Sequence, residues 1–171
     1  IDTEVQTLAA VSADGIYIEE DSGVAVGSTG QLAFPRAPFN RSPVESVMTS
    51  VIVPSLSDLE TTDAGSIKVV SLAGGITIHQ GDTDDMGVSA ASSGNILLEA
   101  RGTGSDIVFN ADIQSGSGHI TVWAADDIDG NADNATLNGT VYLQADNNSI
   151  GTAPNDGVNL AGGAQLNSGD G

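Results

Sequence analysis

A short phrase, a glycine followed by alternating aliphatic and other residues, recurs in the middle of the chain. It occupies Gly94–Leu98, Gly118–Val122 and Gly139–Leu143, so the intervals between the glycines are 24 and 21 residues. Self-similarity at such an interval is typical of solenoids, in which each repeat stacks on the one before it. Within each phrase the aliphatic residues have a period of two, which indicates a short β-strand with one face turned inward.

The strands are too short and too weakly apolar to be stable as isolated hairpins, so we expect them to stack in parallel. A turn of about 21–29 residues that lies on the next at about 4.8 Å lets every strand pair with its counterparts. The predicted strands are Ile96–Glu99, Asp106–Phe109 and Asp112–Gln114 in one turn, then Ile120–Trp123, Asp127–Asp129 and Thr136–Leu137 in the next. The predicted fold is an all-β, right-handed parallel β-helix (β-solenoid) with three short strands per turn.

The chain divides into three predicted regions. Residues 1–32 are interpreted as the first turn, 33–58 as a Pro-rich insertion loop or cap, and 59–171 as further turns. Because the chain starts at Ile1 without methionine and stops in the middle of a phrase, we interpret it as a processed form or a piece of something longer. Its end turns are therefore expected to continue into further repeats or to stack on another copy.

The insertion holds four of the five prolines of the chain. Proline cannot donate to a strand ladder, so this stretch is expected to leave the β-helix. Residues 47–53 are predicted to form a strand or a short helix, and Phe34 and Phe39 to cover apolar surface. Insertions of this kind often carry binding in solenoids.

The formal net charge is −19, with only four Lys and Arg residues. This balance argues against nucleic acid as a partner, because phosphate binding needs clustered basic residues. It also disfavours binding to anionic membrane surfaces. The sequence has no run of about 18 apolar residues, so membrane insertion is not predicted. Acidic side chains, including the run Glu19–Asp21, are expected in solvated turns that keep an edge-rich sheet soluble.

Two acidic turns are candidate Ca²⁺ sites, because carboxylates in Gly-containing turns provide the hard oxygen ligands that Ca²⁺ prefers. The candidate ligands are Asp82, Asp84 and Asp85 in one turn and Asp127, Asp129 and Asp133 in the other. Neither turn matches an EF-hand loop, since Met86 and Ala132 stand at ligand positions. Acidic turns that only contact water are the alternative interpretation.

Catalysis has little support in the sequence. Polysaccharide-cleaving β-helices need carboxylates that converge on one face. Asp126 and Asp127 would face opposite sides of a strand. By the same alternation His79 and His119 point outward, and without His-x-His spacing or cysteines a zinc site is not expected. Asn134-Ala-Thr136 matches the glycosylation sequon, but asparagines of this kind are usually turn residues.

The phrases SIKVVSLAGGITIHQGD, GNILLEARGTGSDIVFNADI and GTVYLQADNNSIGT resemble the repeats of large bacterial exoproteins of the filamentous-haemagglutinin-like adhesin type. The resemblance covers residues 60–166 and, more loosely, 5–32. It implies a non-enzymatic structural or adhesive segment that is secreted or attached to a bacterial cell surface, with itself, carbohydrate or another cell surface as partner. A β-helix that binds or degrades polysaccharide is the alternative.

Overall fold

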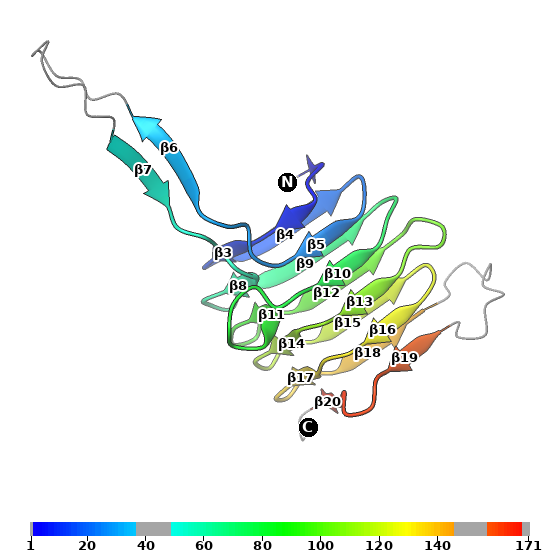
Figure 1. Cartoon of the computed structure of the whole chain (residues 1–171). Helices are drawn as coiled ribbons and strands as arrows, with labels where there is room; N and C mark the ends of the chain where they lie inside the picture. The colour runs from blue at the N-terminus through cyan, green and yellow to red at the C-terminus, as the bar shows by residue number, and fades with distance from the viewer. Residues whose placement is uncertain (1, 37–48, 146–156, 169–171) are drawn as a thin grey trace, which may run out of the picture.

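The part of the chain that the structure describes is a stack of six turns, each with three strands, from which one hairpin projects (Figure 1). The computed structural model describes residues 2–36, 49–145 and 157–168. Every regular element in these ranges is a β-strand, and they contain no helix long and apolar enough to cross a membrane. The predicted all-β parallel β-helix with three strands per turn is confirmed.

The first three turns have the following strands: β1 (Asp2–Thr3), β2 (Thr7–Leu8) and β3 (Ala10–Ser12); β4 (Gly15–Glu20), β5 (Val24–Val26) and β8 (Leu59–Thr61); β9 (Ser66–Ser71), β10 (Ile76–Ile78) and β11 (Met86–Ala90). The last three turns have these: β12 (Ile96–Ala100), β13 (Ile107–Phe109) and β14 (Asp112–Ser115); β15 (Ile120–Ala124), β16 (Ile128–Gly130) and β17 (Asn134–Thr136); β18 (Val141–Gln144), β19 (Val158–Leu160) and β20 (Leu166–Ser168).

The strands of successive turns pair in parallel and form three sheets. Sheet A has the order β1-β4-β9-β12-β15-β18, sheet B the order β2-β5-β10-β13-β16-β19, and sheet C the order β3-β8-β11-β14-β17-β20. The repeated phrases are in register, since Ile96 pairs with Ile120 and Ile120 with Val141. Each turn therefore places its inward residues directly on those of the turn before.

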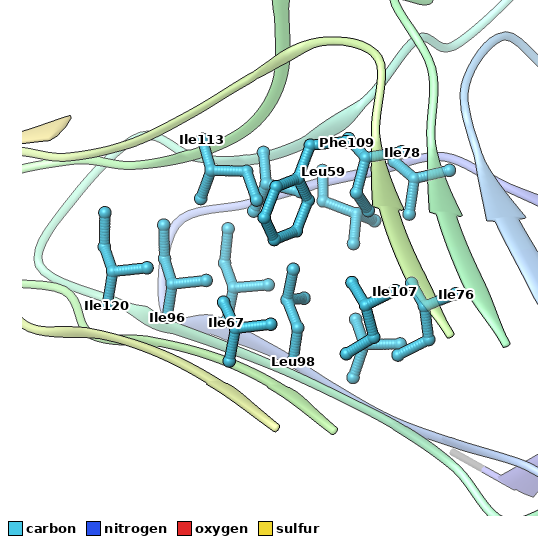
Figure 2. Close-up of a cluster of buried hydrophobic side chains, with 14 of the residues drawn as sticks. Leu59, Ile67, Ile76, Ile78, Ile96, Leu98, Ile107, Phe109, Ile113 and Ile120 are labelled. Atoms are coloured by element: carbon cyan, nitrogen blue, oxygen red, sulfur yellow. The ribbon is translucent and has the colours of Figure 1, made fainter. Parts of the chain in front are cut away.

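The core is a set of aliphatic columns that run along the stack. Figure 2 shows one of them, in which Ile67, Ile96 and Ile120 of sheet A lie in a row. In sheet B, Phe109 is the largest fully buried side chain, and its in-register neighbour one turn later is Gly130. A Cβ at position 130 would overlap the Leu160 side chain of the following turn, at 2.6 Å, so the small residue leaves room for that leucine.

The glycine of each phrase is needed because the turns approach closely at the corner between sheets C and A. Gly65, Gly94, Gly118 and Gly139 lie there on successive turns, and a Cβ on any of the last three would overlap the carbonyl oxygen of the preceding glycine. Ser115 and Thr136 donate hydroxyl hydrogen bonds of 2.8 and 2.7 Å to the carbonyls of Gly94 and Gly118. The corner is thus a column of backbone and small hydroxyl groups.

The predicted insertion is an antiparallel hairpin between β5 and β8, formed by β6 (Leu32–Arg36) and β7 (Thr49–Val53). We call this hairpin the arm. Figure 1 shows that it extends away from the stack, past the N-terminal turn. The expectation that Phe34 covers apolar surface is wrong, since this side chain is 54% exposed. Phe39 lies outside the described residues. Pro35 is tolerated because it stands on an edge strand.

Three further expectations from the sequence need correction. Residues 1–32 are not one turn, because they hold the whole first turn, two strands of the second and the beginning of the arm. The third strand of the fifth turn is Asn134–Thr136, so Leu137, which is 69% exposed, lies outside it. Glu20 is not in solvent: its carboxylate is buried and accepts hydrogen bonds from the Val5 amide and the Ser22 hydroxyl, each 3.1 Å long.

Candidate functional site

The first acidic turn brings three carboxylates together where the chain returns from the arm to the stack. Ligand atoms of Asp58, Asp82 and Asp84 lie within 4.8 Å of one another. Asp58 precedes β8 with a left-handed backbone (φ 60°) and is only 7% exposed, whereas Asp82 and Asp84 are exposed. The sequence identified two of these residues and missed Asp58, because 24 residues separate it from Asp82.

The environment acts differently on the carboxyls of this cluster. Burial raises the pKa of Asp58, against a hydrogen bond of 2.8 Å from the Gly81 amide that lowers it. The Asp84 backbone N–H, which donates to Asp82 Oδ1 at 3.1 Å, lowers the pKa of Asp82. The Ser57 hydroxyl also donates to Asp82, at 3.0 Å. The cluster thus combines one desolvated carboxyl with two solvated ones.

The second acidic turn gathers a different set from the one predicted. Ligand atoms of Asp106, Asp126 and Asp127 lie within 4.8 Å of one another. The expectation that Asp126 and Asp127 face opposite sides of a strand does not apply, because both precede β16 and lie in the bend that enters it. The predicted partners Asp129 and Asp133 are not in this group, and Asp85 is not in the first.

The remaining predicted ligands are engaged in hydrogen bonds. Asp133 Oδ1 accepts from the Gln165 amide of the following turn at 2.8 Å, and Asp129 Oδ1 from the side-chain amide of Asn159 at 3.3 Å. Asp85 Oδ1 accepts from the Gln80 side chain at 2.9 Å. Two of these three aspartates link neighbouring turns, which gives an acidic turn residue a structural use besides solubility.

The turn-to-turn links form two columns at the corners of sheet B. At its entry, Asp106 Oδ1 accepts from the Asp127 amide at 3.1 Å, and Asp127 Oδ1 from the Gly157 amide at 2.6 Å. At its exit, Asp112 Oδ1 accepts from the Asp133 amide at 2.9 Å. A carboxylate that accepts a backbone N–H makes a strong, charge-assisted hydrogen bond, so these columns stabilise the stacking of the last three turns.

Calcium binding stays a prediction, now centred on Asp58, Asp82 and Asp84. If this cluster binds Ca²⁺ with the affinity of extracellular modules, millimolar Ca²⁺ raises the melting temperature, because the ion binds only the folded chain. The Asp84→Asn variant is expected to lose that rise. Asp129→Asn, outside the cluster, should keep it. A melting temperature that does not change at millimolar Ca²⁺ rules the site out.

The Asp58→Asn variant is expected to gain stability relative to the natural chain as the pH rises. A carboxyl whose pKa is higher in the folded than in the unfolded state stabilises the fold at pH values below its unfolded pKa, which is about 3.9 for aspartate. This contribution is lost as the pH rises through the pKa of the folded state. Asparagine tolerates the left-handed backbone and still accepts from the Gly81 amide. Urea unfolding at pH 3 and pH 7 measures the difference.

A matched variant separates the burial of Asp58 from the net charge of the chain. Asp21→Asn removes the same unit of negative charge at an exposed turn position. If burial of the carboxyl is the cause, the pH-dependent gain of Asp58→Asn exceeds that of Asp21→Asn. Equal gains for the two variants would contradict it.

The remaining candidates for chemistry are two histidines and an arginine. His79 and His119 are exposed, as the alternation predicted, and His119 Nδ1 lies 3.0 Å from the Thr140 hydroxyl. Arg101, just after β12, forms an ion pair of 2.8 Å with Glu99. Among the described residues, both acidic clusters consist of aspartates and neither includes a histidine.

Comparison with protein-family models, curated proteins and solved structures finds no match to the chain. The fold assignment therefore stands on the strand pairing itself, and the resemblance to the haemagglutinin-like adhesins stays a prediction.

Proposed function

We propose that this chain is a non-enzymatic structural and adhesive β-solenoid segment of a secreted or cell-surface bacterial protein. The segment acts as an elongated spacer. Its ends stack on further turns of a longer chain or on a second copy of the chain. Six turns at about 4.8 Å contribute about 29 Å to such a column. The observation that carries this proposal is the pair of open ends that the described turns present.

At the N-terminal end, β1, β2 and β3 each have one edge that no strand of the described residues pairs with. A groove of about 570 Å³ opens there, and its lining includes Leu8, Ala10, Ile16 and Ile18, which are inward side chains of the first two turns. An unpaired edge above an apolar interior is a template for another turn of the same kind.

At the other end, β18, β19 and β20 have the complementary edges, which are likewise unpaired within residues 2–36, 49–145 and 157–168. Val158, Leu160 and Leu166 stand in the inward columns of sheets B and C, yet all three are exposed. A further turn at this end would bury them as the earlier turns bury Ile107 and Ile113. The two ends thus offer matching strand edges and apolar interiors for head-to-tail stacking.

The arm supports the adhesive part of the proposal. Leu32 pairs with Val53 and Phe34 with Val51, which puts four apolar side chains on one face of the hairpin. All four are between 41% and 54% exposed. A two-stranded hairpin is marginally stable alone, and an apolar face of this kind is typical of a contact surface.

Analytical ultracentrifugation with electron microscopy over a range of concentrations tests the stacking. We expect elongated assemblies that grow with concentration in the natural chain. Leu166→Lys, which places a charge in the open end, should abolish them, whereas Leu137→Lys, at an exposed leucine outside the inward columns, should not. A natural chain that stays monomeric at every concentration contradicts self-stacking.

Incubation with acidic polysaccharides tests the proposal that the chain is not an enzyme. The proposal expects no release of reducing ends from polygalacturonate or similar chains. Release that disappears in Asp127→Asn would instead establish the alternative, a polysaccharide-degrading β-helix.

A further inference from the structure

The outward face of sheet A ends, at its last two strands, in a group of side chains that we call the ring patch. It comprises His119, Thr121, Trp123, Thr140, Tyr142 and Gln144. These residues alternate with inward ones, since Ile120 and Val122 are fully buried and Val141 packs against the core. Trp123 is 37% and Tyr142 51% exposed. The chain has one tryptophan and two tyrosines, so composition alone does not explain this grouping.

The strand register sets the pattern of the rings. Thr121 pairs with Tyr142 and Trp123 with Gln144. Trp123 lies on β15 and His119 directly precedes that strand, so the two are four residues, or about 13 Å, apart along the chain. Tyr142 lies on the next strand, level with their midpoint. The rings therefore cover an extended strip of the sheet, long enough for a short run of sugar units.

Hydrogen bonds hold the polar atoms of the rings. The Trp123 Nε1–H and the Tyr142 hydroxyl both donate to Gln144 Oε1 at 2.7 Å. The Thr140 amide donates to His119 Nδ1 at 3.1 Å. Rings held in this way lose little conformational entropy when a ligand binds, which favours affinity.

The ring patch carries no carboxylate and no Lys or Arg, in a chain whose net charge is −19. Glu99, the in-register neighbour of Trp123 on the side of β12, is neutralised by its ion pair with Arg101. A polyanion would be repelled by the molecule as a whole, and a cation would find no carboxylate in the patch to pair with. The charge distribution therefore favours an uncharged ligand.

We infer that the ring patch binds an uncharged polysaccharide. Sugar rings have apolar C–H faces, which pack against the electron-rich faces of Trp123 and Tyr142. Their hydroxyls find partners in the threonine hydroxyls around the rings. This inference deepens the proposed adhesive function by naming a surface and a ligand class, but it does not depend on stacking of the chain.

Native affinity electrophoresis of the full chain tests the inference, with hydroxyethylcellulose, laminarin and dextran as neutral probes and polygalacturonate as the anionic one. We expect at least one neutral glucan to slow migration. Trp123→Ala and Tyr142→Ala should each weaken that binding at least about tenfold. Tyr17→Ala is the matched control, because Tyr17 is exposed on the same face of sheet A, on β4, three strands from β15 and four from β18. This variant should bind as the natural chain does.

Each other outcome overturns the inference. These outcomes are no retardation by any neutral glucan, retardation by polygalacturonate alone, and equal loss of binding in Tyr17→Ala. Melting curves of the variants establish that they are folded. If Trp123→Ala instead abolishes self-association of the chain, the patch is a contact between copies. Failure of the stacking experiment leaves the electrophoresis result intact, so the two proposals fail separately.

Discussion

Gly118→Ala is expected to destabilise the fold by about 3 kcal/mol or more, which is a large part of the stability of an ordinary domain. The new Cβ would overlap the Gly94 carbonyl oxygen, a backbone atom that the stack holds in place. That oxygen also accepts a hydrogen bond from the Ser115 hydroxyl, so it cannot move away from the new Cβ without weakening that hydrogen bond. Urea unfolding followed by circular dichroism measures the change.

Gly27→Ala is the control for this substitution. Gly27 is also buried in the stack, but the nearest atom to its Cβ would be His79 Cβ, at an ordinary contact distance of 3.4 Å. Here the change is expected to stay below about 1 kcal/mol. Similar losses at the two glycines would show that close approach at the corner is not what requires glycine.

Asn134→Leu is expected to stabilise the fold by about 2 kcal/mol, because leucine has the shape of asparagine and removes an unsatisfied buried amide. Asn134 is fully buried, and within the described residues neither its Oδ1 nor its Nδ2 has a hydrogen-bond partner. It interrupts an otherwise aliphatic column of sheet C, with Ile113 before it and Leu166 after it. The shift of the urea midpoint gives the size of the gain.

Gln114→Leu serves as the comparison, since this side chain points outward from the neighbouring strand β14. Its effect should remain within about 0.5 kcal/mol. A loss of stability in Asn134→Leu would mean that the amide has a polar partner in the folded protein. The burial of Asn134 also places this sequon out of reach of a modifying enzyme in the folded chain.

Local alternation was enough to predict the fold where each turn repeats the one before it. The phrases that begin at Gly94, Gly118 and Gly139 have the same period and the same leading glycine, so their register follows from the sequence. The structure adds the reason for the glycine, a clash between neighbouring turns. No single turn contains that information.

The prediction from the sequence was wrong where the pairing with the neighbouring turn, and not the local pattern, decides which residue points inward. Leu137 is the more apolar residue, yet pairing of β17 with β14 places Asn134 inside. Glu20 was expected in solvent because it stands in an acidic run, but its carboxylate is buried and accepts a hydrogen bond from the Val5 amide.

The acidic sites were predicted in part for a similar reason. Asp82 and Asp84 are close in sequence and in space, so a local pattern finds them. Asp58 reaches them only because the arm begins and ends at the same corner of the stack. Asp129 and Asp133 are near Asp127 in sequence but lie on and beyond strand β16, which carries them away from its carboxylate.

Disulfide cross-linking tests most directly whether successive turns stack in parallel register, and the chain has no cysteine to interfere. Gln114 and Ala135 are in-register neighbours on outward positions of sheet C, and Ser89 is the neighbour of Gln114 on the other side. Cysteines at 114 and 135 would have Cα atoms about 4.8 Å apart, within disulfide range, whereas cysteines at 89 and 135 would be about 9.6 Å apart. A stacked parallel β-helix predicts efficient oxidation of the first pair and none of the second. Oxidation of the second pair without the first would contradict it.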